Sequence, residues 1–121
     1  MRVLIVEDEY LIARTLAQML TDGGHVVTGM VGSAEKAIQM LEDRICDVAV
    51  VDANLAGSCA APIGAALRKR GIPFVVISGY SKQQLLAGLQ DAPFVPKPVD
   101  PNELLAAVSA LGLRLELDRT H

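Results

Sequence analysis

The sequence is short of the features that mark membrane and secreted proteins. Its 121 residues include no tryptophan and only 3% aromatic residues, and its longest apolar runs are a handful of residues, against the roughly 20 that a transmembrane helix needs. The N-terminus has no basic segment followed by a longer apolar core and a cleavage site, as a secretory signal would. We therefore expect one domain of ordinary size, located in the cytoplasm and not associated with a membrane.

Cysteine, histidine and positive charge are also scarce. Cys46 and Cys59 have no CxxC spacing and no histidine partners, so buried or idle thiols are expected rather than a zinc site or a disulfide. His25 and His121 stand alone and receive no role. The net charge is -3, and the one basic cluster, residues 68–70, suits the C-terminal end of a helix. Binding to nucleic acid, which needs several spread-out cations, is therefore not expected.

Short apolar stretches alternate with segments of helical spacing along the whole chain. The predicted strands lie at residues 3–6 and near 25–31, 46–52, 72–78 and 92–97. The predicted helices carry the apolar residues 11–19, 37–41, 63–67, 85–89 and 104–108, and the fourth of them is short. Such alternation predicts parallel strands joined by right-handed crossovers, with helices on both faces of the sheet. We expect a doubly wound α/β fold of five strands and five helices.

Polar side chains stand where these strands end. Glu7 and Asp8 follow the first strand, Asp52 the third, Ser78 the fourth and Lys97 the fifth. Taken singly, each is a common turn or helix-start residue. In open α/β sheets, however, ligands bind beyond the carboxyl ends of the strands, so we expect these five side chains to form one cluster.

Three carboxylates in one crevice cannot all stay ionised without a cation. A hard divalent ion with oxygen ligands is the simplest partner, and Mg²⁺ (or Mn²⁺) fits because it needs few protein ligands and keeps several waters. We expect Glu7, Asp8, Asp52 and the backbone carbonyl of Asn54 to hold this metal. Glu9 is expected to point away, at the start of the first helix.

A metal beside Asp52 also gives that carboxylate a chemical role. Carboxylates attack phosphoryl groups to form aspartyl phosphates, and the transfer depends mainly on positioning and charge neutralisation. We expect the metal to bind one phosphoryl oxygen, Lys97 a second and the Ser78 hydroxyl a third. The sequence therefore predicts Asp52 as a phosphoacceptor.

This combination resembles the receiver domain of bacterial two-component response regulators over nearly the whole chain. The matching residues are the acidic pair Glu7 and Asp8, then Asp52, Ser78 and the dipeptide 97–98. The resemblance implies the flavodoxin-like strand order 2-1-3-4-5, one receiver domain over 1–121 of the stand-alone type, and a cis bond between residues 97 and 98. Residues 113–121 are then a helix extension or a frayed tail.

The resemblance also implies a function. Asp52 would be phosphorylated by a sensor histidine kinase or a histidine phosphotransfer protein, with self-phosphorylation and autodephosphorylation as the only chemistry of the chain. Phosphorylation would switch an interaction face for a downstream protein partner, and the chain would be a monomer or weak dimer. Ser78 and Phe94, and with them Tyr80, are the candidate switch residues. Phe94 is equally well explained as a core residue of the fifth strand.

Three departures from the family pattern stand out. Ala56 replaces the proline often found four residues after the phosphoacceptor, Val99 replaces a bulky aromatic residue, and the segment 78–97 is shorter than usual. The first two leave the chemistry intact. The third puts the usual output surface, formed by helix four, strand five and helix five, in question.

Other classes fit less well. A phosphatase of the haloacid-dehalogenase type needs two Asp residues one position apart after the first strand, and residues 6–10 lack that pair. A nucleotide-binding protein needs a glycine-rich loop there, but the glycines at 23–24 come after the first helix. The remaining alternative is a receiver-like interaction module that is not phosphorylated.

Overall fold

The computed structural model describes residues 1–43, 46–55, 58–79, 89 and 91–119. Its elements lie in the order β1 (Arg2–Val6), α1 (Tyr10–Asp22), β2 (Val26–Val31), α2 (Ala34–Glu42), β3 (Val48–Asp52), β4 (Asn54–Leu55), β5 (Ser58–Cys59), α3 (Ala61–Lys69), β6 (Phe74–Ser78), β7 (Phe94–Pro96) and α4 (Pro101–Arg119).

Five strands form one parallel sheet in the order β2-β1-β3-β6-β7. The parallel α/β architecture is therefore as predicted. It differs in detail because a short antiparallel pair, β4 and β5, comes between β3 and α3 and shifts the numbering of the later strands. The described residues form four helices rather than five. The predicted short fourth helix, around residues 85–89, lies almost wholly outside the described residues.

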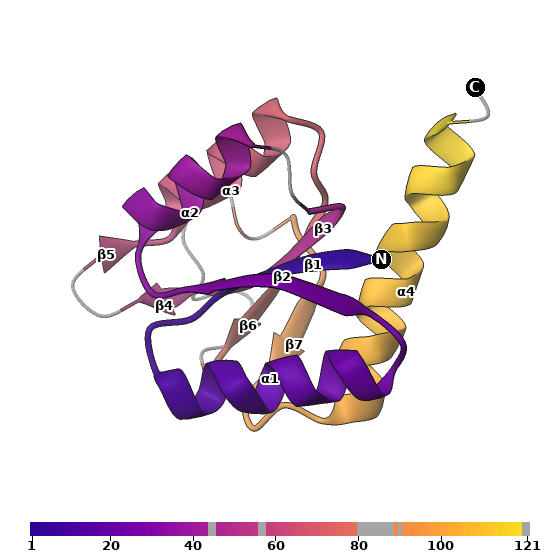
Figure 1. Cartoon of the computed structure of the whole chain (residues 1–121), viewed down its shortest axis with the longest axis horizontal. Coiled ribbons are helices and arrows are strands. Elements are labelled where there is room, and N and C mark those ends of the chain that lie inside the picture. The colour runs from indigo at the N-terminus through magenta and orange to yellow at the C-terminus, as the bar shows by residue number, and fades with distance from the viewer. Residues whose placement is uncertain (44–45, 56–57, 80–88, 90, 120–121) are drawn as a thin grey trace.

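Helices cover both faces of the sheet (Figure 1). On one face, α2 and α3 pack side chains such as Leu41 and Ile63 against Leu4 and Val51. On the other, α1 and α4 pack Leu16 and others against the alternate strand residues. All five residues of β3 are buried, as are all five of β6. These central strands read as continuous apolar runs because each face of the sheet has its own core.

Local signals fix several boundaries. The Ser33 hydroxyl oxygen accepts a hydrogen bond from the Lys36 N–H at 3.2 Å and caps α2. After α1, Gly24 adopts a φ of +90°, which glycine permits at no steric cost, and turns the chain into β2. At the other end of the chain, α4 runs on to Arg119. Residues 113–119 are thus a helix extension, one of the two predicted alternatives.

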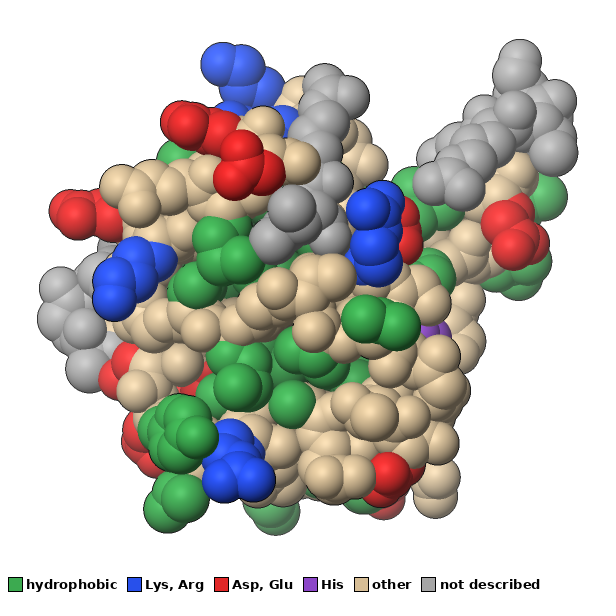
Figure 2. Space-filling view, viewed as in Figure 1, with side chains coloured by type: hydrophobic (Ala, Val, Ile, Leu, Met, Phe, Trp, Pro, Cys, Tyr) green, Lys and Arg blue, Asp and Glu red, His purple; other side chains and the backbone are tan. Residues whose placement is uncertain are grey.

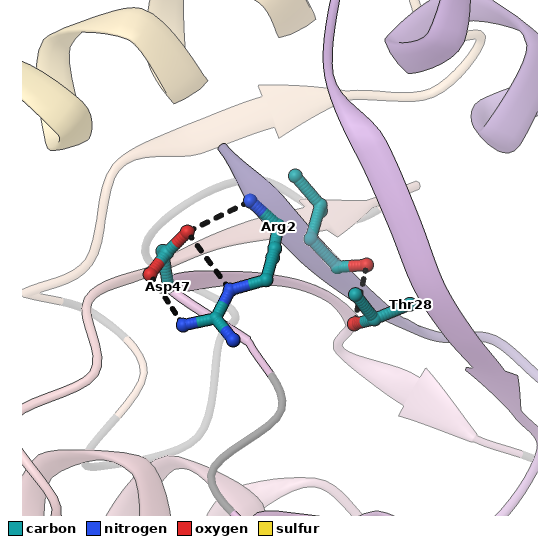
Figure 3. A network of polar contacts seen from close by, with 4 residues as sticks. Arg2, Thr28 and Asp47 are labelled. Atoms are coloured by element: carbon teal, nitrogen blue, oxygen red, sulfur yellow. Dashed lines mark hydrogen bonds and ion pairs between the residues drawn. The ribbon is translucent and has the colours of Figure 1, made fainter.

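An ion pair links the amino ends of β1 and β3 (Figure 3). Asp47, just before β3, accepts a 2.8 Å hydrogen bond from the Arg2 backbone N–H and pairs with its guanidinium at 3.2 Å. The guanidinium and the Arg2 N–H together hold the pKa of Asp47 below its usual value, with the backbone bond as the largest cause. The Thr28 hydroxyl donates to the Val3 carbonyl of the neighbouring strand at 3.4 Å. This end of the sheet is therefore electrostatically satisfied.

Two further expectations concern cysteine and membranes. Cys46 is a buried free thiol, and burial is the largest cause that raises its pKa to about 11, so it stays protonated and inert. The side chain of Cys59 lies outside the described set. Among the helices that the structure describes, none is both long and apolar enough to cross a bilayer.

Candidate functional site

Three carboxylates meet at the carboxyl end of the sheet. Glu7 and Asp8 directly follow β1, and Asp52 is the last residue of β3. The two strands are adjacent, with Val6 in register with Val51. One carboxylate oxygen from each of the three residues lies within 4.8 Å of the others. The structure therefore brings together the acidic residues that the sequence placed in one cluster.

Asp52 is held at both of its carboxylate oxygens. Its side chain is buried, with the residue 1% exposed. The Asn54 backbone N–H donates to Oδ1 at 2.9 Å, and Lys97 Nζ donates to Oδ2 at 2.9 Å. These contacts fix the carboxylate beside Glu7 and Asp8, at the rim of the sheet.

Glu7 is nearly as buried but less completely bonded. Its Oε1 accepts a hydrogen bond from the Glu9 N–H at 3.1 Å. Among the residues that the structure describes, none donates a hydrogen bond to its buried Oε2, which pairs with Lys97 Nζ at 3.6 Å. Burial first, and then the neighbouring Asp52, raise the pKa of Glu7 to about 7. A buried oxygen without a hydrogen bond, facing two more carboxylates, is the donor set that a hard divalent cation completes. The residues therefore fit a Mg²⁺ site.

Lys97 supplies the positive charge of the cluster. It follows β7, and its backbone N–H donates to the Ser78 carbonyl at 2.9 Å. The bond between Lys97 and Pro98 is cis, as the family resemblance implied. Partial burial lowers the pKa of Lys97, but the hydrogen bond and charge of Asp52, with Glu7, more than offset this and leave the pKa raised. Lys97 is therefore fully charged at neutral pH.

The other predicted residues occupy distinct places. Ser78 ends β6, is fully buried and lies in register with Pro96. Phe94 begins β7 and is half-buried against the core under α2 and α3. Asn54 is exposed at the start of β4. Tyr80 falls outside the described residues. Glu9 is exposed and immediately precedes α1, yet its charge is near enough to Lys97 to help raise the pKa of Lys97.

Two features of the site were not predicted. The first is the hydrogen bond that the Asn54 backbone N–H donates to the Asp52 carboxylate. It was missed because it depends on how the backbone turns after β3, which the sequence pattern does not show. The second is an apolar groove of about 600 Å³ beside Lys97, walled by α1 and by the start of the segment after β7. Leu11 and Thr15 from α1 and Val99 line this groove. The α1 residues showed only the spacing of a helix, which does not reveal a groove.

The sequence of this chain matches a known protein family over most of its length. The profile described as the response regulator receiver domain matches residues 3–109. The chain belongs to this family. As a receiver domain, it is a component of two-component signal transduction.

Individual relatives agree with this placement. The chain is 30% identical to the transcriptional regulatory protein PdtaR of Mycobacterium tuberculosis over 111 residues, which cover 88% of the chain and 54% of PdtaR. The crystal structure of the response regulator PhyR from Brucella abortus superimposes with a TM-score of 0.84 at 29% identity, covering 98% of this chain and 50% of that one. SdrG from Sphingomonas melonis Fr1 gives 0.79 at 35% identity, covering 91% and 94%. The receiver domain spans about half the length of the curated relatives it matches.

Proposed function

We propose that this receiver domain accepts a phosphoryl group on Asp52. The observation that carries the proposal is the pair of contacts on that carboxylate, from the Asn54 N–H and from Lys97 Nζ, both at 2.9 Å. They hold a buried nucleophile beside a cation and two further carboxylates. A phosphoryl transfer requires this combination of fixed position and charge compensation.

Glu7, Asp8 and Asp52 would hold Mg²⁺ (or Mn²⁺), with the Asn54 carbonyl as a further ligand. When bound, the ion supplies charge neutralisation for the phosphoryl oxygens. The support is the buried Oε2 of Glu7, which accepts no hydrogen bond from the described residues, and the 4.8 Å grouping of the three carboxylates.

In the transfer itself, an oxygen of Asp52 attacks phosphorus while the bond from phosphorus to the donor atom breaks. The donor is the phosphohistidine of a sensor kinase or of a histidine phosphotransfer protein, and the histidine leaves with the electron pair of the broken bond. Lys97 compensates the charge on one phosphoryl oxygen, and the hydroxyl of Ser78 donates to another. Water later cleaves the acyl phosphate. The chain thus contributes phosphoacceptance and autodephosphorylation rather than turnover of an external substrate.

The groove beside Lys97 suits the phosphodonor protein. Leu11 is 78% exposed and Tyr10 65% exposed at the start of α1, and Lys97 lines the same groove. A partner seated there would bury exposed apolar surface and bring its histidine next to Asp52. The setting would be the cytoplasm, as expected from the sequence.

The output would follow from Ser78 and Phe94. The Ser78 carbonyl already accepts the Lys97 N–H, so a phosphoryl group that draws in the Ser78 hydroxyl would also move the β7 segment. Phe94, half-buried two residues before the end of β7, is the aromatic side chain positioned to respond. A downstream protein would read the altered face around β7 and α4.

Incubation with acetyl phosphate and Mg²⁺ tests the proposal. Intact-mass spectrometry should show one added phosphoryl group on the wild-type chain and none in the presence of EDTA. Asp52→Asn should remain unmodified, while Asp43→Asn, at an exposed position after α2, should be modified like the wild type. Wild-type protein that takes up no phosphoryl group would instead favour the interaction module that is not phosphorylated.

A further inference from the structure

A pocket of about 510 Å³ lies at the amino ends of β6 and β7. Ser78 and Lys97 lie at the other, carboxyl ends of these strands, so this amino-end pocket is separate from the carboxylate cluster. Its walls come from the carboxyl end of α3, the starts of the two strands and the second half of α4. Its volume falls within the about 300–1,000 Å³ that is usual for small-molecule sites. Four of its lining residues are buried apolar residues, namely Ile72, Phe74, Ala92 and Leu111.

Two arginines line the amino-end pocket from opposite faces of the sheet. Arg68 belongs to α3 and Arg114 to α4, and these helices cover opposite faces. Neither guanidinium forms an ion pair with a carboxylate that the structure describes, whereas Arg2 is paired with Asp47. Asp91 also lines the pocket, so its lining carries two positive charges and one negative charge. The pocket therefore favours an anionic group.

An aromatic ring fixes the position of Arg68. Its guanidinium lies 5.4 Å from the centroid of the Phe74 ring, within the about 6 Å of a cation–π contact. A guanidinium that stacks on a ring keeps its N–H donors at its edge, where an anion can accept them. The last turn of α3 is capped by a different arginine, because Arg70 Nη1 donates to the Ala66 carbonyl at 3.2 Å. Arg68 is therefore positioned in advance for an acceptor in the pocket.

The two arginines are not part of a broad basic surface. The chain has a net charge of -3, and basic side chains are scattered among acidic ones on the face that Figure 2 draws. Of the three successive basic residues 68–70, only Arg68 lines the pocket. A polyanion such as nucleic acid needs several spread-out cations. Two guanidiniums beside apolar side chains instead fit a ligand with one anionic group and an apolar body.

We propose that the amino-end pocket binds a small organic acid that has one carboxylate and an apolar body. The carboxylate accepts hydrogen bonds from Arg68 and Arg114, because the planar guanidinium matches the geometry of a carboxylate. The apolar body lies against Ile72, Phe74 and Leu111 and is removed from water there. This inference does not rest on the phosphorylation chemistry, because no residue of the carboxylate cluster takes part in it.

Probes with the same hydrocarbon body and different head groups test the class of ligand. Octanoate, octanol and octylammonium are titrated into the isotope-labelled full chain at constant ionic strength, and amide shifts are followed by NMR. Octanoate should bind about tenfold or more tightly than either other probe, because only its head group forms charge-assisted hydrogen bonds with arginine. The largest shifts should fall at the amides of Gly71, Ile72 and Ala92. Equal affinity for octanol and octanoate, or largest shifts outside the pocket, would overturn the proposal.

The length of the hydrocarbon chain tests the apolar part of the pocket. Each methylene group that is fully removed from water strengthens binding by about fourfold. Octanoate has four more methylene groups than butanoate, so it should bind at least about tenfold more tightly than butanoate. Equal affinity for the two acids would mean that the arginines merely pair with anions at the surface, and would contradict an apolar binding pocket.

Substitution of the arginines tests the anionic part. Arg68→Gln and Arg114→Gln should each weaken octanoate binding by about tenfold or more and leave octanol binding unchanged. The matched control is Arg14→Gln, because Arg14 also lies over an aromatic ring, that of Tyr10 at 5.9 Å, but does not line the pocket. This control should bind octanoate like the wild type. Octanoate affinity that is unchanged in both Arg68→Gln and Arg114→Gln, or lowered as much in Arg14→Gln, would overturn the proposal.

Discussion

Two aspartates stand at the two ends of one strand in very different surroundings. Asp47 precedes β3 and is satisfied by Arg2, through the backbone N–H at 2.8 Å and the guanidinium at 3.2 Å. Asp52 ends the same strand, is 1% exposed and shares its surroundings with Glu7, Asp8 and Lys97. The residue type is the same at both ends, so the difference lies in what surrounds each carboxylate.

The pKa shifts at the two ends run in opposite directions. At the amino end, bonds from Arg2 lower the pKa of Asp47. At the carboxyl end, burial and the nearby Asp52 raise the pKa of Glu7 to about 7. At the amino end of the sheet, the charge of Asp47 is balanced by Arg2. At the carboxyl end, the three carboxylates carry more negative charge than Lys97 can balance. That excess of negative charge favours a divalent cation, which would in turn offset the negative charge of a phosphoryl group.

Removing the positive charge of Lys97 should have the largest effect. Lys97→Ala deletes a charge-assisted contact, which is worth about 1.5–3 kcal/mol, so phosphorylation by acetyl phosphate should slow by about ten- to a hundredfold. Affinity for Mg²⁺ should stay nearly unchanged or rise, because the carboxylates lose a competing positive charge. Rates from intact mass, with exposed Lys36→Ala as control, measure this. Equal rates in the two variants would exclude a role for Lys97 in the transfer.

Binding of Mg²⁺ to the carboxylate cluster should have the second largest effect. Mg²⁺ at about 100 times its Kd should raise the free energy of unfolding of the wild type by about 2.7 kcal/mol, because only the folded chain has the site. Asp8→Asn should lose this gain, and Asp47→Asn should keep it. Urea unfolding with and without Mg²⁺ gives both values. Mg²⁺ stabilisation that survives in Asp8→Asn would place the metal elsewhere.

The smallest effect is expected from removal of Asp47, at the amino end of β3. Asp47→Ala should lower the free energy of unfolding at pH 7 by about 1 kcal/mol, which is less than the about 1.5–3 kcal/mol of a charged hydrogen bond because the pair lies at the surface. The folded pKa of Asp47 lies below its unfolded value of about 3.9, so its contribution is complete above that value. It is lost as pH falls through the folded pKa.

Urea unfolding of wild type and Asp47→Ala, from pH 7 down to below the unfolded pKa of Asp47, measures what the Asp47 charge contributes to the free energy of unfolding. The exposed Asp43→Ala serves as control. The difference between wild type and Asp47→Ala should shrink as the pH is lowered. A difference that is constant with pH would mean that the charge of Asp47 is not what stabilises the fold.

Much of this contrast could be predicted from the sequence. The apolar runs that end in Glu7, Asp52, Ser78 and Lys97 predicted that these residues lie together at the carboxyl end of the sheet. Buried parallel strands can be recognised as continuous apolar runs, and their carboxyl ends meet on the same side of the sheet. The helix extension after residue 112 was one of two alternatives, and the hydrophobic spacing within it could not choose between them.

Other features depend on three-dimensional detail that a pattern does not carry. The role of Asp47 was missed because its partner, Arg2, is 45 residues away in the sequence. The β4 and β5 pair was missed because its two-residue strands are too short to show a period. The Oε2 of Glu7 is buried without a hydrogen bond from the described residues because of how the side chains are placed, which residue spacing does not fix.

The most direct test locates the phosphoryl group along β3. Wild-type protein phosphorylated with acetyl phosphate and Mg²⁺ is treated with borohydride, which reduces an aspartyl phosphate to a stable alcohol, and peptides are then sequenced by mass spectrometry. The reduced residue should be Asp52, with Asp47 and Asp8 unchanged in the same sample. Modification at Asp47, or at any carboxylate other than Asp52, would contradict the assignment of the carboxyl end of the sheet as the phosphoacceptor site.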